Sequence, residues 1–511
     1  MHDVIVAGGG PVGLFTAHEL ALAGCSVLVL ERDREPASRW KVLPLGLRGL
    51  NAGSARTLDR RGLLEAVADA SGTDVATLGA PPDAESAPAP RAMSHFAGMD
   101  LDATRIDVAA LEYRLPAPAA EGFMTSQHAV NSVLSQRTAD LGVDIVRGAA
   151  VTAVSQDNDC VVVRAGDHDH RARWLVGRDG GRSVVRALAG FGFVGTEPAF
   201  TGYVAHVSFA DAQQLPLGFN VTPDGMYLRT PFEGHVGMMD FDGGTFDRSQ
   251  ALTRDHLESV LCRVSGIDVS IDEVHLASSF TDRAMQASTY RMGRVLLAGD
   301  AAHIHSPLGG QGLNLGIGDA LNLGWKLAAT VHGHAGDELL DTYEAERHPV
   351  GAAVLEWSRA QVAAMHPGHN IPALRKLLLD LMSTPCGATH VYRMTSGLFE
   401  HYDIGGGHPI VGTTAPEFRL ADGSRLGELI REGCGIVLDF TGHRALRDAA
   451  DGWAGRIHYL TGPARNDLGL DALLIRPDGV VAWASAGAPD MGMFMEAATR
   501  WFGRPDRRSS G

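Results

Sequence analysis

The N-terminal hydrophobic residues fall into two short runs separated by an amphipathic segment. Residues 3–7 (DVIVA) form a compact apolar run that ends in three glycines, and residues 25–32 (CSVLVLER) form a second. Between them, residues 11–24 carry apolar side chains at helical spacing and end at Gly24, a residue type common just after helices. A strand, a helix and a strand at this spacing predict a parallel sheet.

Hydrophobic spacing predicts further elements of the same unit. Residues 54–70 have a helical pattern that is interrupted near Gly62, residues 131–141 have another, and residues 143–148 (VDIVRG) are typical of a strand. Residues 73–91 are rich in Ala, Pro, Asp and Ser, which favours a surface loop. We therefore expect an α/β unit that carries one long loop.

The pattern changes between residues 201 and 282. Segments such as GYVAHVSFA, GMYLRT and HVGMMDFD are short and β-prone, which favours a mainly antiparallel sheet inserted into the first domain. The α/β pattern resumes at GRVLLAGD, long helical patterns follow at 341–365 and 373–381, and new strand-like segments follow residue 405. We predict a discontinuous domain at 1–200 and 282–375, a sheet domain at 201–281, a linker helix at 376–400 and a third domain at 401–511.

Composition restricts the classes of protein that remain open. The chain has 511 residues, 45% hydrophobic and 20% charged, with a formal net charge of −16. This charge argues against binding of nucleic acid or of an anionic membrane. No apolar run reaches the ~18 residues of a transmembrane helix, and the N-terminus lacks the basic region of a signal peptide. Five scattered cysteines without CxxC or a metal-ligand pattern indicate a cytoplasmic protein with reduced thiols and no metal site.

The glycines after the first strand predict a dinucleotide site. Gly8, Gly10 and Gly13 form GxGxxG, in which the first allows a tight turn, the second lets the backbone approach a pyrophosphate and the third allows close helix packing. Glu31 ends the second strand, where an acid binds a ribose and disfavours a 2′-phosphate, so the nucleotide is FAD or NAD. A glycine-rich turn beside a surface acid is the alternative. The nucleotide-binding set is Gly8, Gly10, Pro11, Val12, Gly13, Glu31 and Arg32.

Two later motifs identify a family. VGRDGGRSVVR (176–186) and GRVLLAGDAAHIHSPLGGQGLNLGIGDALNLGWKL (293–327), together with GGGPVG, resemble the fingerprints of single-component FAD-dependent aromatic hydroxylases of the para-hydroxybenzoate hydroxylase type. The resemblance is closest to the branch that oxidises aromatic polyketides and rifamycin-type antibiotics. It implies an α/β fold with a GxGxxG parallel-sheet FAD domain, an inserted antiparallel substrate sheet and a C-terminal thioredoxin-like domain. That last domain lacks CxxC here, so we expect it to serve packing or contacts in a homo-oligomer.

The resemblance also implies residue roles. The Asp of the GD motif, here Asp300, would hold the ribityl chain, and the following loop would run along the isoalloxazine, with a helix dipole directed at the reduced flavin. Gly46 and Gly53 stand where the family often has arginine, which leaves Arg48 as the expected flavin-edge cation, with a surface role as the alternative. The implied cofactor set adds Gln127, Asp179, Asp300, Pro307, Gly310, Gly312, Leu313 and Asn314, and the implied catalytic set is Arg48, Pro307, Gly309 and Gly310. Metal binding or base catalysis by His303 and His305 is not expected.

The implied reaction is hydroxylation of a phenolic or quinonoid polycyclic substrate. Tightly bound FAD, reduced by transient NADPH or NADH, would react with O2 to give a C4a-hydroperoxide that the aromatic ring attacks. We expect the substrate between the flavin and the inserted sheet, against about half of a set that strand alternation divides between two faces: Phe219, Met226, Tyr227, Phe232, Met238 and Phe241. Baeyer–Villiger oxidation, inactivation of an antibiotic, or a non-catalytic flavin-binding protein are the alternatives.

Overall fold

The N-terminal unit is built on a parallel sheet. The structure, a computed structural model, describes residues 1–506 apart from 80–83, 88, 92–93 and 212–213. The parallel strands are β1 (His2–Ala7), β2 (Val27–Glu31), β7 (Asp144–Arg147), β10 (His168–Gly177) and β19 (Val295–Leu297), in the order β19-β10-β1-β2-β7. The sheet predicted from the hydrophobic runs is confirmed, and the side chains of Val4, Ile5 and Val6 are fully buried, as expected for a central strand covered on both faces.

Antiparallel strands that the sequence did not reveal extend this sheet. β18 (Arg291–Met292) pairs with β19, β9 (Val161–Ala165) pairs with β10, and β8 (Val151–Gln156) pairs with β9. Three smaller sheets lie nearby: β11 (Phe193–Thr196), β17 (Ala284–Ala287) and β20 (His303–Ile304); β3 (Leu47–Leu50) and β6 (Phe123–Ser126); β4 (His95–Phe96) and β5 (Met99–Asp100).

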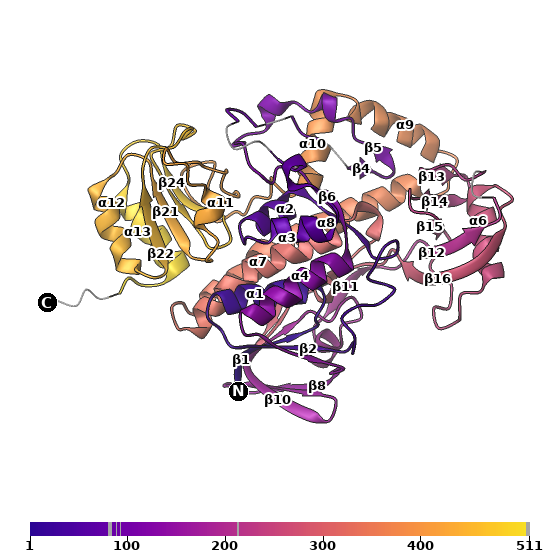
Figure 1. Cartoon of the computed structure of the whole chain (residues 1–511), viewed down its shortest axis with the longest axis horizontal. Helices are drawn as coiled ribbons and strands as arrows, with labels where there is room; N and C mark the ends of the chain where they lie inside the picture. The colour runs from indigo at the N-terminus through magenta and orange to yellow at the C-terminus, as the bar shows by residue number, and fades with distance from the viewer. Residues whose placement is uncertain (80–83, 88, 92–93, 212–213, 507–511) are drawn as a thin grey trace.

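Helix α1 (Pro11–Leu22) packs against α4 (Gln127–Asp140) and α7 (Gly312–Val331) beside the parallel sheet (Figure 1). The helical pattern of residues 54–70 forms α2 (Ala52–Asp59) and α3 (Leu64–Ala70), and Gly62 at φ +66° lies in the break predicted between them. α5 (Val184–Leu188) follows the DG motif. The loop predicted at 73–91 contains the short helix η1 (Val75–Thr77) and lies partly outside the described residues.

The inserted sheet has two different faces. Its strand order is β13-β14-β15-β12-β16, all antiparallel: β12 (Thr201–Phe209), β13 (Gly218–Thr222), β14 (Gly225–Arg229), β15 (His235–Asp240) and β16 (Ile271–Thr281). Helix α6 (Arg254–Ser265) covers one face, and its apolar residues pack there with Tyr203, Tyr227 and Met238. The opposite face looks towards the centre of the molecule, as Figure 1 shows. The predicted antiparallel sheet is therefore confirmed.

Two helices, rather than one, lead to the C-terminal unit from the N-terminal unit, which we call the FAD unit after the cofactor that the sequence predicts. The long α8 (Asp337–Met365) is followed by α9 (Ile371–Met382), which starts before the predicted linker, and by α10 (Pro385–Ser396). Thr384 and Pro385 explain the division, because the Thr384 hydroxyl accepts a hydrogen bond from the Gly387 N–H and proline is well tolerated in a first helical turn. Spacing alone merged the two helices because both are amphipathic.

The C-terminal unit has its own mixed sheet and hydrophobic core. β21 (Gly435–Asp439) runs parallel to β22 (Ile457–Thr461) and antiparallel to β23 (Ala472–Ile475), which pairs with β24 (Val481–Ser485). The segment 417–424 contributes only isolated bridges. α11 (Leu426–Leu429), α12 (Arg444–Ala450) and α13 (Met491–Phe502) complete the unit, shown in yellow in Figure 1.

Buried ion pairs join the C-terminal unit to the FAD unit. Arg476 pairs with Glu346 of α8 at 2.8 Å through both guanidinium NH2 groups, and Lys326 of α7 reaches the same carboxylate at 2.9 Å. Arg347 of α8 binds the Tyr402 hydroxyl at 2.9 Å. Separating the units would leave buried charges without a partner, which costs free energy. These contacts therefore hold the two units together in one arrangement.

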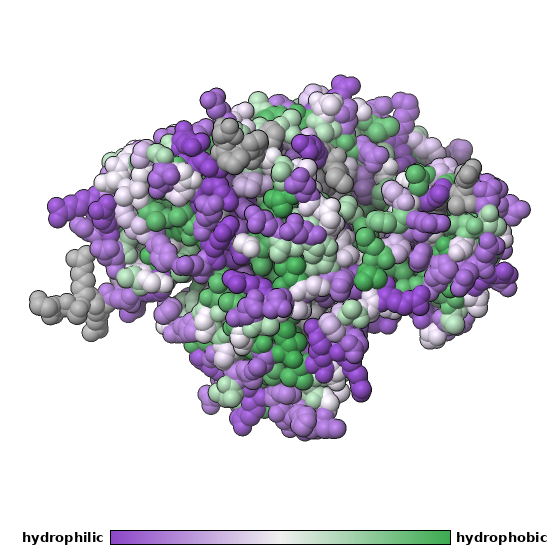
Figure 2. Space-filling model, viewed as in Figure 1, coloured by the Kyte–Doolittle hydropathy of each residue, from purple (hydrophilic) through white to green (hydrophobic). Residues whose placement is uncertain are grey.

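The molecular surface is mixed in polarity. In Figure 2 hydrophilic residues dominate the outer parts of the C-terminal unit and of the inserted-sheet unit, while hydrophobic residues gather nearer the centre of this face. Among the helices of the described residues, none is long and apolar enough to cross a membrane.

Candidate functional site

The glycine loop after β1 leaves room for a ligand at one position only. Gly8 has φ +115°, and a Cβ there would lie 2.3 Å from the Arg178 carbonyl oxygen; a Cβ on Gly13 would lie 1.9 Å from the Gly8 carbonyl oxygen. A Cβ on Gly10 would meet no atom within 4 Å. Gly8 and Gly13 are thus required by the fold, whereas bare backbone at Gly10 faces open space at the N-terminus of α1, which suits an anionic group. Pro11 is the first residue of that helix.

Acidic residues beside this loop hold it in place. Glu31 at the end of β2 accepts a hydrogen bond from the Gly9 N–H at 2.5 Å and one from the Asp33 N–H at 2.8 Å. The Asp179 carboxylate caps α5, accepting from the Val184 and Val185 N–H groups at 2.6 and 3.0 Å, and its backbone nitrogen lies against Gly8. The exposed Arg32 side chain lies 3.7 Å from Asp33.

A cavity of about 670 Å³ brings most of the second predicted group together. It lies between the FAD unit and the inner face of the inserted sheet. Val12 links it to the glycine loop, since a Cβ on Gly299, next to Asp300, would lie 3.2 Å from the Val12 side chain. The predicted residues that line the cavity are Arg48, Gln127, Asp300, Pro307, Gly310, Gly312 and Leu313. We call it the flavin cleft, after the cofactor that the sequence resemblance implies.

Arg48 brings a positive charge to the flavin cleft without a carboxylate bonded to it. Its guanidinium donates to the Leu47 carbonyl oxygen at 2.7 Å and to Gln127 Oε1 at 3.0 Å, and no ion pair of Arg48 occurs in the described part of the chain. Burial lowers the Arg48 pKa, and the nearby charge of Asp300 opposes this. The Asp300 carboxylate makes no hydrogen bond within the described residues and is exposed to the cleft. Polar groups here are therefore free for a ligand.

Asn314 fixes the loop that borders the cleft. Its amide nitrogen donates to the Gly49 and Gly310 carbonyl oxygens, both at 3.0 Å, and its amide oxygen accepts from the Asn51 N–H at 2.9 Å. Gly310 has φ +62° with open space where a Cβ would stand, so bare backbone faces the cavity there, at the start of α7. Gly309 is packed instead, because its Cβ would lie 2.9 Å from Gln361.

The two histidines of this segment have different surroundings. His303 is buried and pairs with Asp319 at 2.7 Å, and Asp319 also accepts from Arg347 and from the Gly299 N–H, each at 2.9 Å. Burial alone would raise the Asp319 pKa, but the charges of His303 and Arg347 outweigh it and hold the pKa well below its usual value. His305 lines the cleft with Nε2 unpartnered, and burial lowers its pKa. His303 thus supports the backbone beside Asp300.

A second cavity of about 360 Å³ adjoins the flavin cleft and shares Gly49, Met124, Phe219, Leu228 and Gly310 with it. We call it the chamber. Its walls include segments that sequence reasoning missed: His95 before β5, Trp357 of α8 and Tyr392 of α10. These positions lie in three separate segments of the chain and carry no motif, so only the fold reveals them. The hydrophobicity of their helices was the only available signal.

Polar atoms in the chamber lack partners. Among the residues that the structure describes, Ser94 Oγ, Trp357 Nε1 and the Tyr392 hydroxyl are buried without a hydrogen bond. Burial raises the pKa of Tyr392 to about 12, raises the Glu121 pKa and lowers the His95 pKa. Tyr392 and His95 are therefore favoured in their neutral forms, and a ligand would supply the missing hydrogen-bond partners.

The predicted substrate-wall set, of which about half was expected to face the ligand, places Phe219 alone of its members in the lining of the chamber and the flavin cleft. Tyr227 and Met238 face α6 on the other side of the sheet. Met226 shares the inner face but is fully buried in a neighbouring core cluster, against which Phe241 packs. Phe232 lies in the turn before β15 and is 37% exposed. The inner face presents Leu228, Gly237, Val204 and Ser278 instead.

Comparison with known proteins now assigns the fold. Residues 1–358 match the FAD binding domain family, and residues 408–505 match the C-terminal domain of aromatic-ring hydroxylases. The chain belongs to the FAD-dependent aromatic-ring hydroxylases. It is therefore an FAD-dependent aromatic monooxygenase, and the fit of the Gly10 position and of the cleft to a dinucleotide agrees with this.

Several relatives of this hydroxylase match over nearly the whole length. A monooxygenase of Claviceps purpurea is 43% identical over 98% of both chains. The 12-dehydrotetracycline 5-monooxygenase/anhydrotetracycline 6-monooxygenase of Streptomyces rimosus is 36% identical over 99% of both, and the dialkyldecalin synthase of Streptomyces rugosporus is 35% identical over 98% of both. The solved structure of an anhydrotetracycline hydroxylase from Streptomyces rimosus superposes with a TM-score of 0.84 at 34% identity, covering 99% of both chains.

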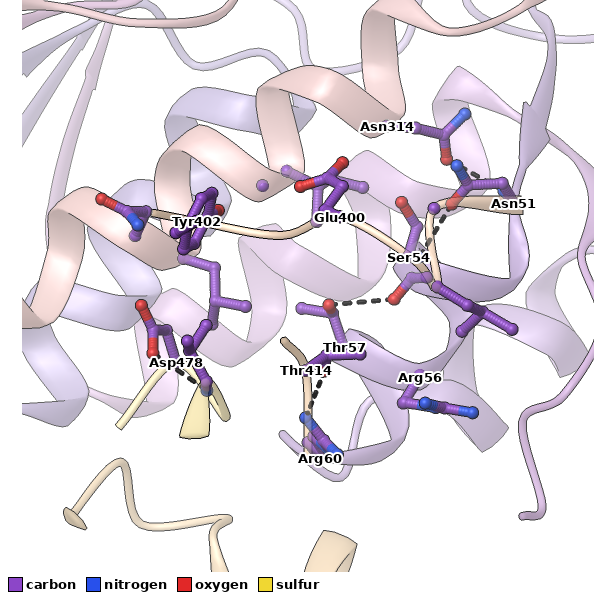
Figure 3. Close-up of a pocket in the computed structure, with 18 of the residues that line it drawn as sticks. Asn51, Ser54, Arg56, Thr57, Arg60, Asn314, Glu400, Tyr402, Thr414 and Asp478 are labelled. Atoms are coloured by element: carbon purple, nitrogen blue, oxygen red, sulfur yellow. Dashed lines mark hydrogen bonds between the residues drawn. The ribbon is translucent and has the colours of Figure 1, made fainter. Parts of the chain in front are cut away.

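The hydroxylase has a further small, polar pocket of about 80 Å³ where α2 and α7 meet segment 397–414 (Figure 3). Glu400, Tyr402 and Asp478 border one side and Thr57 and Thr414 another. Arg60 donates to Thr414 Oγ1 at 3.1 Å. This pocket lies at the junction of the two units. Within the described residues, no cluster of His, Cys, Asp or Glu suited to a metal ion is found.

Proposed function

We propose that this hydroxylase inserts one oxygen atom of O2 into a phenolic or quinonoid polycyclic compound, with NADPH or NADH as transient reductant. One observation supports it most: the chamber has apolar walls with a few buried, unpartnered hydrogen-bonding groups, and it opens beside the Gly309–Gly310 backbone that borders the flavin cleft. A flat ring system with oxygen substituents matches such walls. The name of the Streptomyces rimosus relative, an anhydrotetracycline 6-monooxygenase, is consistent with this substrate class.

We assign the FAD-binding groups as follows. The pyrophosphate would lie on the Gly8–Gly13 loop and the N-terminus of α1, with the adenosine ribose near Glu31. Asp300 and Gln127 would bind the ribityl chain and flavin edge, and Arg48 would add a positive charge at that edge. The backbone from Pro307 to Leu313 and the dipole of α7 would favour the anionic form of the reduced ring. Bound FAD supplies the electron transfer and O2 activation that no side chain provides.

The remaining residues would orient the substrate and exclude water. Trp357 Nε1 donates, and the hydroxyls of Tyr392 and Ser94 donate or accept, so these groups match carbonyl and hydroxyl oxygens on the ligand. Phe219 and Leu228 would pack against its rings, since they line both cavities. A desolvated chamber also keeps water from the reacting centre.

The test uses the purified holoenzyme with a panel of polycyclic phenols and quinones. We expect NAD(P)H oxidation that depends on substrate, with one ¹⁸O atom from ¹⁸O2 in the product, located by mass spectrometry. Trp357→Phe and Tyr392→Phe should raise KM by about three- to tenfold without loss of FAD, because each removes one hydrogen bond. Tyr459→Phe in the C-terminal unit is the matched control and should leave KM unchanged.

The same measurements decide between the alternatives. Insertion of oxygen next to a ketone, with ring expansion, would indicate Baeyer–Villiger oxidation, and loss of antibacterial activity of the substrate would indicate antibiotic inactivation. Substrate turnover without NAD(P)H oxidation would contradict the proposal and point to a non-oxidative role, as the name of the synthase among the relatives suggests for that protein.

A further inference from the structure

A third cavity, of about 220 Å³, lies behind the chamber and collects arginines. α10 separates the two spaces, presenting Tyr392 to the chamber and Arg393 to this cavity. Arg56 of α2 and Arg114 of the loop before β6 also line it, together with Tyr113, His401 and Thr413. We call it the arginine cavity. Neither the family match nor the relatives assign a ligand to it.

The buried side chain of Arg56 gives the main evidence for a ligand in this cavity. It is only 8% exposed, and within the described residues its Nε is buried without a partner and its guanidinium makes no hydrogen bond or ion pair. Figure 3 shows its side chain extending away from Thr57 and Thr414. Arg114 lies close enough to repel it electrostatically. A buried guanidinium without a counter-charge is costly in free energy, and a nearby like charge adds to that cost.

The guanidinium of Arg114 also lacks hydrogen-bond partners. Both of its terminal nitrogens, Nη1 and Nη2, are buried without a hydrogen-bond partner in the part of the chain that the structure describes. The two carboxylates whose charges influence Arg56 pair with another arginine: Arg425 binds Glu417 Oε1 at 2.9 Å and Asp59 at 3.3 Å, while Glu417 Oε2 has no hydrogen-bond partner within the described residues. Arg393 is exposed at the rim, where its guanidinium lies 5.3 Å from the Phe399 ring centre. Three arginines and one glutamate, the exposed Glu112, line the cavity, so its lining carries a net positive charge in a protein whose net charge is −16.

We propose that the arginine cavity binds a phosphate group between Arg56 and Arg114. Planar guanidinium groups match tetrahedral oxyanions through paired N–H donors, and such charge-assisted bonds would satisfy the free nitrogens. A cavity of about 220 Å³ accommodates a phosphate with part of the molecule that carries it. Two sources share this chemistry: inorganic phosphate, and a phosphate of the nicotinamide dinucleotide. The site does not depend on which compound is hydroxylated.

Thermal unfolding of the holoenzyme with increasing sodium phosphate, at constant ionic strength set with sodium chloride, tests the site. We expect phosphate to raise the Tm of the wild type by a few degrees, because a ligand that binds only the folded state stabilises it. Arg56→Gln and Arg114→Gln should raise the phosphate Kd by at least about tenfold. Arg105→Gln, an exposed arginine of the same loop region that does not line the cavity, is the control.

The sign of the stability change gives a second readout. Without phosphate, Arg56→Gln should leave the Tm unchanged or raise it, because an unpaired buried charge is removed; with phosphate, the wild type should become the more stable protein. An equal phosphate shift in wild type and both variants, or no shift in the wild type, would overturn the proposal. If Arg56→Gln does not fold, Arg114→Gln alone carries the test, since Arg114 is only partly buried.

Steady-state kinetics identify the source. If the dinucleotide supplies the phosphate, Arg114→Gln raises the KM for NADPH or NADH at least about tenfold and inorganic phosphate competes with that reductant. If free phosphate is the ligand, the KM for both reductants stays unchanged while the phosphate-dependent Tm shift is still lost. A variant that lowers kcat alone and retains the wild-type phosphate Kd would refute the site.

Discussion

Two aspartates of this protein differ in whether other residues already supply hydrogen bonds to their carboxylates. Asp319 accepts hydrogen bonds from His303, Arg347 and the Gly299 N–H, whereas Asp300, nineteen positions earlier, has no hydrogen-bond partner within the described residues and faces the flavin cleft. The contacts of Asp319 show that it stabilises the fold, whereas the fold gives the Asp300 carboxylate no such role. The contrast separates a structural acid from an acid that is free to bind a ligand.

Removal of the Asp300 carboxylate should therefore weaken FAD binding more than it weakens the fold. We expect Asp300→Ala to raise the FAD dissociation constant on the order of tenfold or more, because a hydrogen bond to a charged group contributes about 1.5–3 kcal/mol. The ratio of flavin to protein absorbance after gel filtration measures retention. Asp337→Ala, which removes an exposed acid bound to Arg291, should retain FAD normally; normal retention by Asp300→Ala would remove this residue from the site.

The sequence predicted ligand-binding residues only where a motif carries them. The glycine loop and the Pro307–Asn314 segment are contiguous, so their spacing could be recognised before the fold was known. Trp357, Tyr392 and Ser94 come from three distant segments, and their common feature, a buried polar atom without a partner, exists only after folding. No residue pattern in a single sequence encodes that property.

At the scale of elements, the strand–loop–helix unit that starts the chain provides a direct comparison. Gly10 precedes α1 with φ −74° and ψ 178°, a conformation open to alanine, and a Cβ there meets nothing. Gly13 has no such freedom, because its Cβ would collide with the Gly8 carbonyl oxygen. Gly10 therefore leaves space that a ligand can occupy, whereas Gly13 is required for packing.

Alanine at these two positions should therefore act on different properties. Gly10→Ala should leave the stability of the apoprotein nearly unchanged and weaken FAD binding, since the methyl group occupies the space where phosphate approaches the backbone. Gly13→Ala should lower the free energy of unfolding by roughly 1–3 kcal/mol or more through overpacking. Urea unfolding of both apoproteins, with FAD titration of each, measures the two effects; equal destabilisation by both substitutions would contradict this assignment.

Element prediction succeeded where hydrophobic period and length agreed. The first two strands, their helix and the break at Gly62 follow from local pattern, and so does the antiparallel nature of the insert. Alternation identified its strands but did not show which half of the candidate wall residues faces the cavities; Tyr227 and Met238 belong to the half that packs against α6. The face is decided by α6, an amphipathic helix from a later segment. The division of the linker into α9 and α10 depends on one capping threonine.

For the whole molecule, Arg61 joins three parts of the chain. Its guanidinium contacts both oxygens of Glu19 in α1, at 2.8 and 3.0 Å through Nε, and donates to the Ile430 and Pro477 carbonyl oxygens of the C-terminal unit at 3.1 and 2.8 Å. Burial alone would raise the Glu19 pKa, but the charge of Arg61 and hydrogen bonds from His18 and Arg61 lower it to about 2. The Glu19–Arg61 pair therefore makes the stability of the contact between the two units depend on pH.

The direction of that coupling follows from the two pKa values of Glu19. Its pKa is lower in the folded state than the ordinary 4.5, so between about 2 and 4.5 the unfolded chain binds more protons and acid favours unfolding. The stabilisation is present above pH 4.5 and is lost as the pH falls towards 2, by about 3 kcal/mol in total.

Glu19→Gln should therefore be less stable than the wild type at neutral pH and should lose less stability on acidification. Urea unfolding across this pH range measures both changes. Glu496→Gln, an exposed carboxyl on α13, should follow the wild-type profile. Parallel pH profiles for Glu19→Gln and the wild type would show that Arg61 does not couple the units in this way.

The two-faced inserted sheet has a consequence for how this enzyme diversifies. Because successive side chains alternate between the α6 core and the cavities, the positions that line the cavities are separate from those that keep the sheet folded, although they are neighbours in sequence. Gly237, at the centre of the inner face, leaves space that a larger residue would fill. We therefore expect substrate range to change through substitutions at Gly237, Val204, Leu228 and Ser278, while selection for folding acts on the residues between them. A small focused library at these four positions would explore new substrates with little risk to stability.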